Sequence, residues 1–239
     1  MNTIAITAAT AKEISSLVCL TGATECTLQG SRATYEGKCG RQRIILAITG
    51  MGKVNTASAL TALLGRYSPH LLINTGCAGA YGGSSLVVGD LAIATAEIYG
   101  DEGVLTPSGW EPLDCIGIPL LKVQGRNYFN ELPISTEFIE KAVRFADSQA
   151  ISLRSGKFVT VSTCSGTSAR GGELAIRFDA ICENMEGAAS AHVALMNGVE
   201  FVEIRGVSNI VEDRDLSSWD IARACENVQC FIHSFIESL

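Results

Sequence analysis

Short apolar runs of strand length recur along this chain, and each ends in glycine or in small polar residues. Ile44–Ile48 is apolar throughout, Leu71–Asn74 nearly so, and Leu91–Ile98 continues the pattern. A strand that is apolar at every position has to be covered on both faces, as in a parallel sheet. Amphipathic segments of helical period lie between these runs. The alternation predicts an α/β fold, namely a three-layer α/β/α sandwich around a central, twisted, mixed but mostly parallel sheet.

The same patterns place most of the elements. Strands are expected at Ile4–Ala8, Ile44–Ile48, Leu71–Asn74, Leu91–Ile98, Phe158–Val161 and Gly198–Val202. Helices are expected at 13–20, 53–67 and 135–149, after Glu186 in an Ala-rich segment, and from near Trp219 onward. Residues 75–83 and 100–119 are rich in glycine and are expected to be loops. Since no repeat, linker or low-complexity tract interrupts the pattern, we expect one domain over residues 1–239.

Charge and cysteine usage exclude several classes of partner. The net charge of −7 and the lack of a basic stripe argue against nucleic acid and against an anionic membrane. No apolar run reaches transmembrane length, and the first residues lack the basic start of a secretion signal, so a cytoplasmic location is expected. The nine cysteines include no C-x-x-C pair, and the three histidines lie far apart. Neither a disulfide framework nor a metal site is therefore expected.

Two polar clusters fall where an open α/β sheet binds ligands, at helix N-termini and at the carboxyl ends of strands. Asn184–Ala189 offers the Glu186 carboxylate, and Arg205–Asn209 ends in a carboxamide. Together they suit a small polar ligand with hydroxyls and ring nitrogens. The glycine-rich segments Gly50–Lys53 and Gly76–Gly79 lack the spacing of a triphosphate or dinucleotide site, so no cofactor is expected.

Each candidate residue also has a purely structural interpretation. Thr10 and Glu13 match a capping box, so Glu13 alone could simply cap its own helix. Glu186 could be an ordinary exposed helix residue, although its apolar surroundings make an unpaired carboxylate costly. Asn209 could be a turn former after a strand.

The chain resembles the nucleosidase branch of the purine nucleoside phosphorylase superfamily. The motifs that carry the resemblance occur in the family's order: 8–13, 50–54, 74–79, 88–90, 184–187 and 205–209. Within the branch, Tyr99–Val104, Thr106–Trp110, Val161–Cys164 and Ser208–Asp215 are most similar to the enzymes that hydrolyse futalosine. Those enzymes release hypoxanthine and dehypoxanthine futalosine in an alternative route of menaquinone biosynthesis.

The resemblance implies a role for each residue of the site. Glu186 would accept hydrogen bonds from the ribose 2′ and 3′ hydroxyls, and Met185 would pack on the ribose. Glu13 would position and deprotonate the attacking water. Asn209, held by Ser208, would bind N7 and O6 of the purine. The further substrate-binding residues that it implies are Cys77, Ala78, Gly79, Gly166 and Asn184.

Asn209 bears on the choice of base, since the adenine-cleaving nucleosidases have aspartate there. An amide donates to a 6-oxo group, which a carboxylate would repel, so Asn209 favours hypoxanthine. The aromatic residue that stacks on the base in the family is not found in Ser165–Thr167.

Four alternatives stay open. The substrate could be methylthioadenosine and S-adenosylhomocysteine, or aminodeoxyfutalosine. A phosphorylase is disfavoured, because the arginines that bind phosphate in related phosphorylases correspond approximately to Asn74 and Glu13. A nucleoside-binding protein is disfavoured by the presence of both Glu13 and Glu186. The resemblance further implies a homodimer or larger homo-oligomer that needs only its nucleoside and water.

Overall fold

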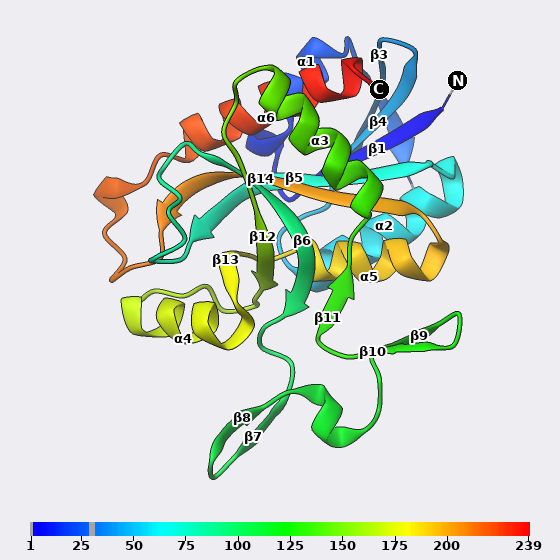
Figure 1. Cartoon of the computed structure of the whole chain (residues 1–239). Coiled ribbons are helices and arrows are strands. Elements are labelled where there is room, and N and C mark those ends of the chain that lie inside the picture. Colours follow the sequence, from blue (N-terminus) through cyan, green and yellow to red (C-terminus); the bar gives the residue numbers. More distant parts are fainter. Residues whose placement is uncertain (1, 29–31) are drawn as a thin grey trace.

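A ten-stranded mixed sheet forms the centre of the molecule (Figure 1). The structure is a computed structural model that describes residues 2–28 and 32–239. The strands of the sheet are β1 (Thr3–Ala8), β2 (Thr24–Leu28), β3 (Arg32–Cys39), β4 (Gln42–Ile48), β5 (Leu71–Ala80), β6 (Leu91–Tyr99), β11 (Glu131–Pro133), β12 (Leu153–Thr160), β13 (Ala180–Asn184) and β14 (Glu200–Ile210). Parallel pairs β4–β1–β5–β14 and β6–β12–β13 make up most of it, and β2, β3 and β11 pair antiparallel at the edges.

Helices cover both faces of this sheet. They are α1 (Ser15–Leu20), α2 (Lys53–Tyr67), α3 (Thr136–Ser148), α4 (Ser168–Phe178), α5 (Gly187–Asn197) and α6 (Ile221–Glu237), with 3₁₀ turns at Ala11–Glu13, Leu113–Ile116 and Leu216–Ser218. Figure 1 shows α1, α3 and α6 on one side and α2 and α5 on the other. The predicted three-layer sandwich is confirmed. No helix within the described residues is both long and apolar enough to span a membrane.

The core lies in two layers because successive strand residues point to opposite faces. Ile4 and Ile6 pack under α1, α3 and α6, whereas Ala5 packs toward α2 and α5. Ile44 and Ile45 divide in the same way. A strand whose two faces are both buried needs apolar residues at every position, which is the pattern that the sequence shows.

The predicted loop at residues 75–83 is wrong for residues 75–80, because β5 continues to Ala80. Likewise, β14 runs on to Ile210 instead of ending near Val202. The two strands pair along this extension, with Arg205 opposite Gly76 and Asn209 opposite Gly79. Glycine-rich, polar strand ends look like loops in sequence, but here the backbone groups are satisfied by each other.

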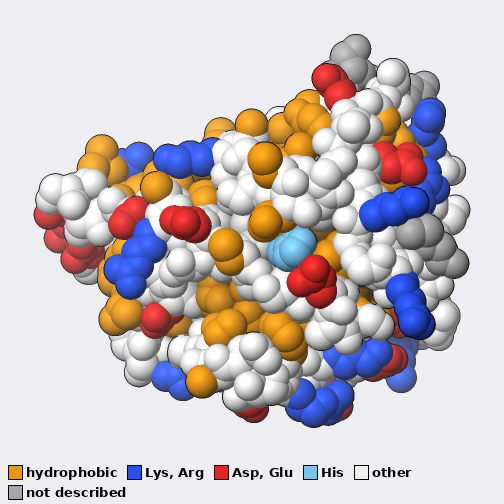
Figure 2. All heavy atoms as spheres, turned by 90° about the horizontal axis from the view of Figure 1, so that it is seen from above, with side chains coloured by type: hydrophobic (Ala, Val, Ile, Leu, Met, Phe, Trp, Pro, Cys, Tyr) orange, Lys and Arg blue, Asp and Glu red, His pale blue; other side chains and the backbone are white. Residues whose placement is uncertain are grey.

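Other elements were not expected from the sequence. The β2–β3 hairpin has no strong apolar period. Helix α4 is amphipathic, and the hydroxyl of Thr167, just before its first residue, accepts the Arg170 N–H. The expected loop at 100–119 contains the hairpin of β7 (Val104–Thr106) and β8 (Gly109–Glu111), which projects from the body in Figure 1. A second small hairpin, β9 (Leu121–Val123) and β10 (Arg126–Tyr128), follows. On the face that carries α1, α3 and α6, charges of both signs are interspersed (Figure 2).

Candidate active site

A cavity of about 210 Å³ opens at the carboxyl ends of the central strands. Its wall brings together residues far apart in sequence: Ala9, Thr10, Glu13, Met51, Cys77, Ala78, Gly79, Cys164, Ser165, Glu183, Asn184, Met185, Glu186, Arg205, Ser208, Asn209 and Trp219. Nine of the ten predicted site residues are in this wall, and Gly166 is the neighbour of Ser165. A larger hollow of about 890 Å³ over α2 contains none of them, so size alone does not locate the site.

Glu13 is held at the edge of the cavity by three donors. Its Oε2 accepts the Thr10 N–H at 2.9 Å and the Thr10 hydroxyl at 2.8 Å, so the capping box is present. Its Oε1 accepts the Cys77 N–H of β5 at 3.0 Å. This bond to a distant strand is not part of a helix cap. A Cβ at Gly76 would overlap this carboxylate. Glycine at position 76, with φ +145°, therefore leaves room for Glu13.

Glu186 occupies the position just before the first residue of α5 and is only 4% exposed. Its Oε1 accepts the Gly52 N–H at 2.9 Å, and its Oε2 lies 3.4 Å from Nη2 of Arg205. The interpretation of Glu186 as an exposed helix residue is therefore wrong. Its neighbour Met185 lies in the same wall, with its sulfur 3.3 Å from Cys164 Sγ.

Arg205 belongs to the site, although its place in the sequence did not predict a role for it. It is 1% exposed and donates through Nε to Glu203 at 2.7 Å, through Nη1 to the Cys77 carbonyl at 3.0 Å and through Nη2 to Asn74 at 2.8 Å. Burial lowers the pKa of Arg205, but the charges of Glu203 and Glu186 outweigh burial and leave it above its ordinary value. The spacing of Glu203 and Arg205, two apart in an apolar strand, places both on one face and could have indicated the pair.

Asn184 directs its side chain to the protein's own backbone. Its Oδ1 accepts the N–H groups of Glu186 at 2.9 Å and Gly187 at 2.7 Å, which fixes the start of α5. Its Nδ2 donates to Glu97 at 2.8 Å. Direct contact of Asn184 with substrate stays a prediction, whereas its support of Glu186 is visible in these bonds.

Behind Arg205, the carboxyl groups of Glu97 and Glu203 are buried together over Gly187. Burial, followed by the nearby charge of Glu203, raises the pKa of Glu97 well above its ordinary value of 4.5. Burial also raises the pKa of Glu203, but Arg205 opposes this effect. Glu97 thus keeps its proton, and Glu203 carries the charge that pairs with Arg205.

We expect Glu97→Gln to fold and to lose less stability as the pH rises. Above about 4.5 the unfolded chain releases this proton while the folded protein keeps it, so the contribution of Glu97 is complete at low pH and declines toward its raised folded pKa. A neutral amide does not titrate, so the variant lacks this decrease of unfolding free energy with rising pH. Unfolding free energies from urea titrations between about pH 5 and pH 8 provide the measurement. The same pH dependence of unfolding free energy in wild type and variant would contradict the assignment of a protonated Glu97.

Asn209 lies inside β14 and is 8% exposed, so the interpretation as a turn former is wrong. The Ser208 hydroxyl is 2.8 Å from its Oδ1, and its Nδ2 donates to the Ile210 carbonyl at 3.2 Å. An amide nitrogen carries two hydrogens, so one remains for a ligand. The orientation set by Ser208 makes Asn209 a donor toward the cavity.

Trp219 supplies an aromatic surface to the cavity wall. From the sequence, Trp219 is expected only at the beginning of the last helix, which starts at Ile221. The Arg214 guanidinium lies 5.5 Å from the centre of its ring. No local pattern links Trp219 to the polar clusters, because only the path of the chain after β14 returns it to the site.

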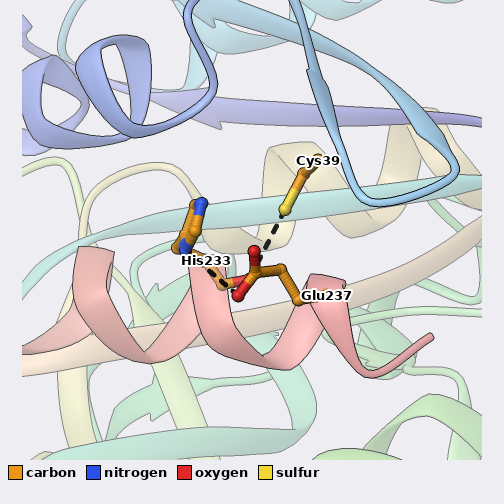
Figure 3. Close-up of side chains that lie close together, drawn as sticks. All are labelled: Cys39, His233 and Glu237. Atoms are coloured by element: carbon orange, nitrogen blue, oxygen red, sulfur yellow. Dashed lines mark hydrogen bonds and ion pairs between the residues drawn. The ribbon is translucent and has the colours of Figure 1, made fainter.

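One group of possible metal ligands occurs among the described residues, and it lies outside the cavity (Figure 3). Cys39, at the end of β3, faces His233 and Glu237 on α6, whose Nδ1 and Oε2 are 3.7 Å apart. Burial, followed by the charge of Glu237, raises the pKa of the Cys39 thiol to about 11. The thiol donates to the His233 carbonyl and packs in the core as a neutral group. These contacts account for Cys39 without a metal.

Comparison with known proteins adds to this geometry. The profile of the phosphorylase superfamily matches residues 3–238. The futalosine hydrolase of Thermus thermophilus is 36% identical over 172 residues, 72% of this chain and 71% of that protein. The 5′-methylthioadenosine/S-adenosylhomocysteine nucleosidase of Halalkalibacterium halodurans is 32% identical over 194 residues, 78% of this chain and 76% of its own. The corresponding nucleosidase of Neisseria meningitidis, solved in complex with methylthio-immucillin-A, superposes with a TM-score of 0.86 at 26% identity, with both chains fully covered.

Proposed function

The chain belongs to the phosphorylase superfamily, and we propose that it hydrolyses the N-glycosidic bond of futalosine to hypoxanthine and dehypoxanthine futalosine. That it is a nucleosidase follows from its similarity to both kinds of nucleosidase. The choice of futalosine rests on Asn209, whose amide Ser208 orients as a donor toward the cavity. The futalosine hydrolase of Thermus thermophilus supports the same choice.

The reaction needs stabilisation of a positive sugar and activation of water. As the bond to the base breaks, the ribose acquires oxocarbenium character, and a fixed carboxylate beside it lowers the barrier. Glu186 is fixed by Gly52 and Arg205 and faces the cavity, so it suits this role and the ribose hydroxyls. Glu13 is the second carboxylate of the wall and takes the proton of the attacking water.

Water, and not phosphate, is the nucleophile in this proposal. Phosphate needs free cationic donors, but the three nitrogens of Arg205 already donate to protein oxygens. Two carboxylates, Glu13 and Glu186, face the same space and would repel the anion. Asn74, where related phosphorylases have a cation, is buried and bonded to Arg205 and Ser190.

A second candidate is hydrolysis of 5′-methylthioadenosine and S-adenosylhomocysteine. It is favoured by relatives with that activity in their names, such as the protein of Halalkalibacterium halodurans. Asn209 speaks against it, because its donor would face the 6-amino group of adenine, which also donates.

We expect purified protein to cleave futalosine faster than methylthioadenosine or inosine, and at the same rate with and without phosphate. The second part follows because Arg205, the cation among the described residues of the wall, is 1% exposed and already paired with carboxylates. Chromatography of the released base and sugar provides the measurement, with a reaction lacking protein as control.

Each other outcome contradicts a defined part of the proposal. Preference for methylthioadenosine would establish the second candidate. A strict phosphate requirement with a sugar 1-phosphate product would make the protein a phosphorylase. Binding without turnover of any of the three nucleosides would identify a nucleoside-binding protein.

A further inference from the structure

A third carboxylate, that of Glu183, lies in the cavity wall, and the hydrolysis proposed above gives it no role. It is 6% exposed and comes from β13, which pairs with β5 so that Glu183 is opposite Gly79. Asn209 is opposite the same glycine from β14, on the other side of β5. Side chains at paired positions of neighbouring strands project to one face of the sheet. Glu183 and Asn209 therefore flank Gly79 on the face that lines the cavity.

Gly79 separates these two side chains without adding a side chain of its own. A Cβ there would lie 3.3 Å from Asn209 Nδ2, 3.6 Å from Glu183 Cγ and 2.9 Å from a methyl of Val211. The Val211 methyl therefore packs where a larger residue would need room, with the amide on one side and the carboxylate on the other. The two polar groups are close enough together to meet neighbouring positions on the edge of one planar ring.

The Glu183 carboxylate is oriented by Ser165. The Ser165 N–H donates to Oε1 at 2.8 Å, and the Ser165 hydroxyl donates to Oε2 at 2.6 Å. The buried Tyr81 hydroxyl also interacts with this carboxylate. Two carboxylate oxygens have four lone pairs, so one acceptor position still remains for a ligand. A fixed acceptor beside a fixed donor is a hydrogen-bond pattern that a base edge can match or fail to match.

We propose that Glu183 accepts a hydrogen bond from N1–H of hypoxanthine and is a specificity-determining residue for 6-oxopurines. The inference rests on the proposed function, which identifies the base, and extends it to a second contact. A 6-oxopurine presents an acceptor at O6 beside a donor at N1, which matches donation by Asn209 and acceptance by Glu183. Adenine presents the reverse pattern, so its N1 lone pair would face the carboxylate and its amino group would face the amide.

The test uses free bases, so that it does not depend on turnover. Calorimetry would measure the affinity of the wild type for hypoxanthine, adenine and 1-methylhypoxanthine, whose N1 carries a methyl in place of the hydrogen. We expect hypoxanthine to bind best and methylation at N1 to remove most of the affinity. Equal affinity for hypoxanthine and its 1-methyl derivative would overturn the proposal, and this result requires no variant.

Glu183→Gln tests the residue itself. We expect it to weaken hypoxanthine binding by roughly 10- to 100-fold, because a charged acceptor is lost. Adenine binding should stay the same or improve, since the new amide can donate to N1. Ser165→Ala should weaken hypoxanthine binding by less than Glu183→Gln does and should leave adenine binding unchanged, because it loosens the carboxylate without removing its charge. Glu173→Gln, on the exposed face of α4, should leave every affinity unchanged.

The outcomes separate Glu183 from the proposed function. An unchanged ratio of hypoxanthine to adenine affinity in Glu183→Gln would mean that the residue only fastens the Ser165 segment. If the wild type does not cleave futalosine but the ratio shifts, the role of Glu183 stands and the proposed substrate fails. If futalosine is cleaved and the ratio does not shift, the proposed substrate stands and the role of Glu183 fails.

Discussion

Glu13→Gln should keep the fold and ligand binding while losing turnover by on the order of 10²–10⁴-fold, the usual cost of removing a positioned base. The amide oxygen of glutamine can still accept the two Thr10 donors, but its NH2 group then faces the Cys77 N–H, so that one bond is lost and a modest loss of stability is expected. The amide cannot take a proton from water, so the loss of turnover should far exceed the loss of stability or of ligand binding. The measurement is kcat together with the dissociation constant of a bound product, in wild type and variant.

Thr10 provides a control for the structural role of Glu13. Thr10→Ala removes the hydroxyl that donates to the same carboxylate at 2.8 Å but leaves the carboxylate in place. It should therefore lower the melting temperature while kcat stays close to that of the wild type. Near-normal turnover in Glu13→Gln, with a loss of melting temperature like that of Thr10→Ala, would show that Glu13 serves the helix alone.

The charges around Arg205 explain why several acids can share one small site. Glu186 and Glu203 both contact the Arg205 guanidinium, and Glu97 stays protonated behind them. A buried charge is tolerated when it is paired and hydrogen-bonded, and a neutral acid adds no further repulsion. The cost of placing several carboxylates together is thus offset by Arg205 in the cavity wall and by the pairing of Glu203 with it from behind.

The sequence predicted the layers of the fold because a buried strand and an amphipathic helix leave direct patterns in the order of residues. It also singled out Glu13, Glu186 and Asn209, which the structure brings to one wall. It missed the length of β5, because glycine in a sequence usually signals a turn. Here Gly76 makes room for the Glu13 carboxylate and Gly79 for a methyl of Val211. What a glycine faces is set by distant strands and cannot be read locally.

The same reason explains the residues of the site that received no role. Arg205 has one local contact, with Glu203 in the same strand, but its contacts with Asn74, Cys77 and Glu186 come from distant parts of the chain. Trp219 enters the wall only because the segment after β14 folds back over the strand ends. Glu183 precedes a recognised motif by one residue, but its relation to Asn209 depends on Gly79 lying between them. Tertiary pairing, and not local pattern, creates these contacts.

Glu186→Gln should lower kcat/KM by about 10²–10³-fold, the scale observed when one preorganised electrostatic contact to a transition state is removed. The neutral amide still accepts the Gly52 N–H but no longer offers a charge to the ribose hydroxyls or to the developing cation. Both KM and kcat should therefore change, since the contact exists before and during bond cleavage. Steady-state kinetics with the nucleoside that the wild type cleaves fastest, alongside melting temperatures, provide the measurement.

Glu203→Gln is the matched control, because Glu203 also binds Arg205 but does not line the cavity. Removing its charge leaves a buried arginine with one carboxylate fewer. This should lower the melting temperature clearly and change kcat/KM only slightly. The two variants should thus separate, with Glu186→Gln acting mainly on kinetics and Glu203→Gln mainly on the melting temperature. If Glu186→Gln instead shows normal kinetics and a lower melting temperature, its carboxylate serves Arg205 and the start of α5 and does not act on the sugar.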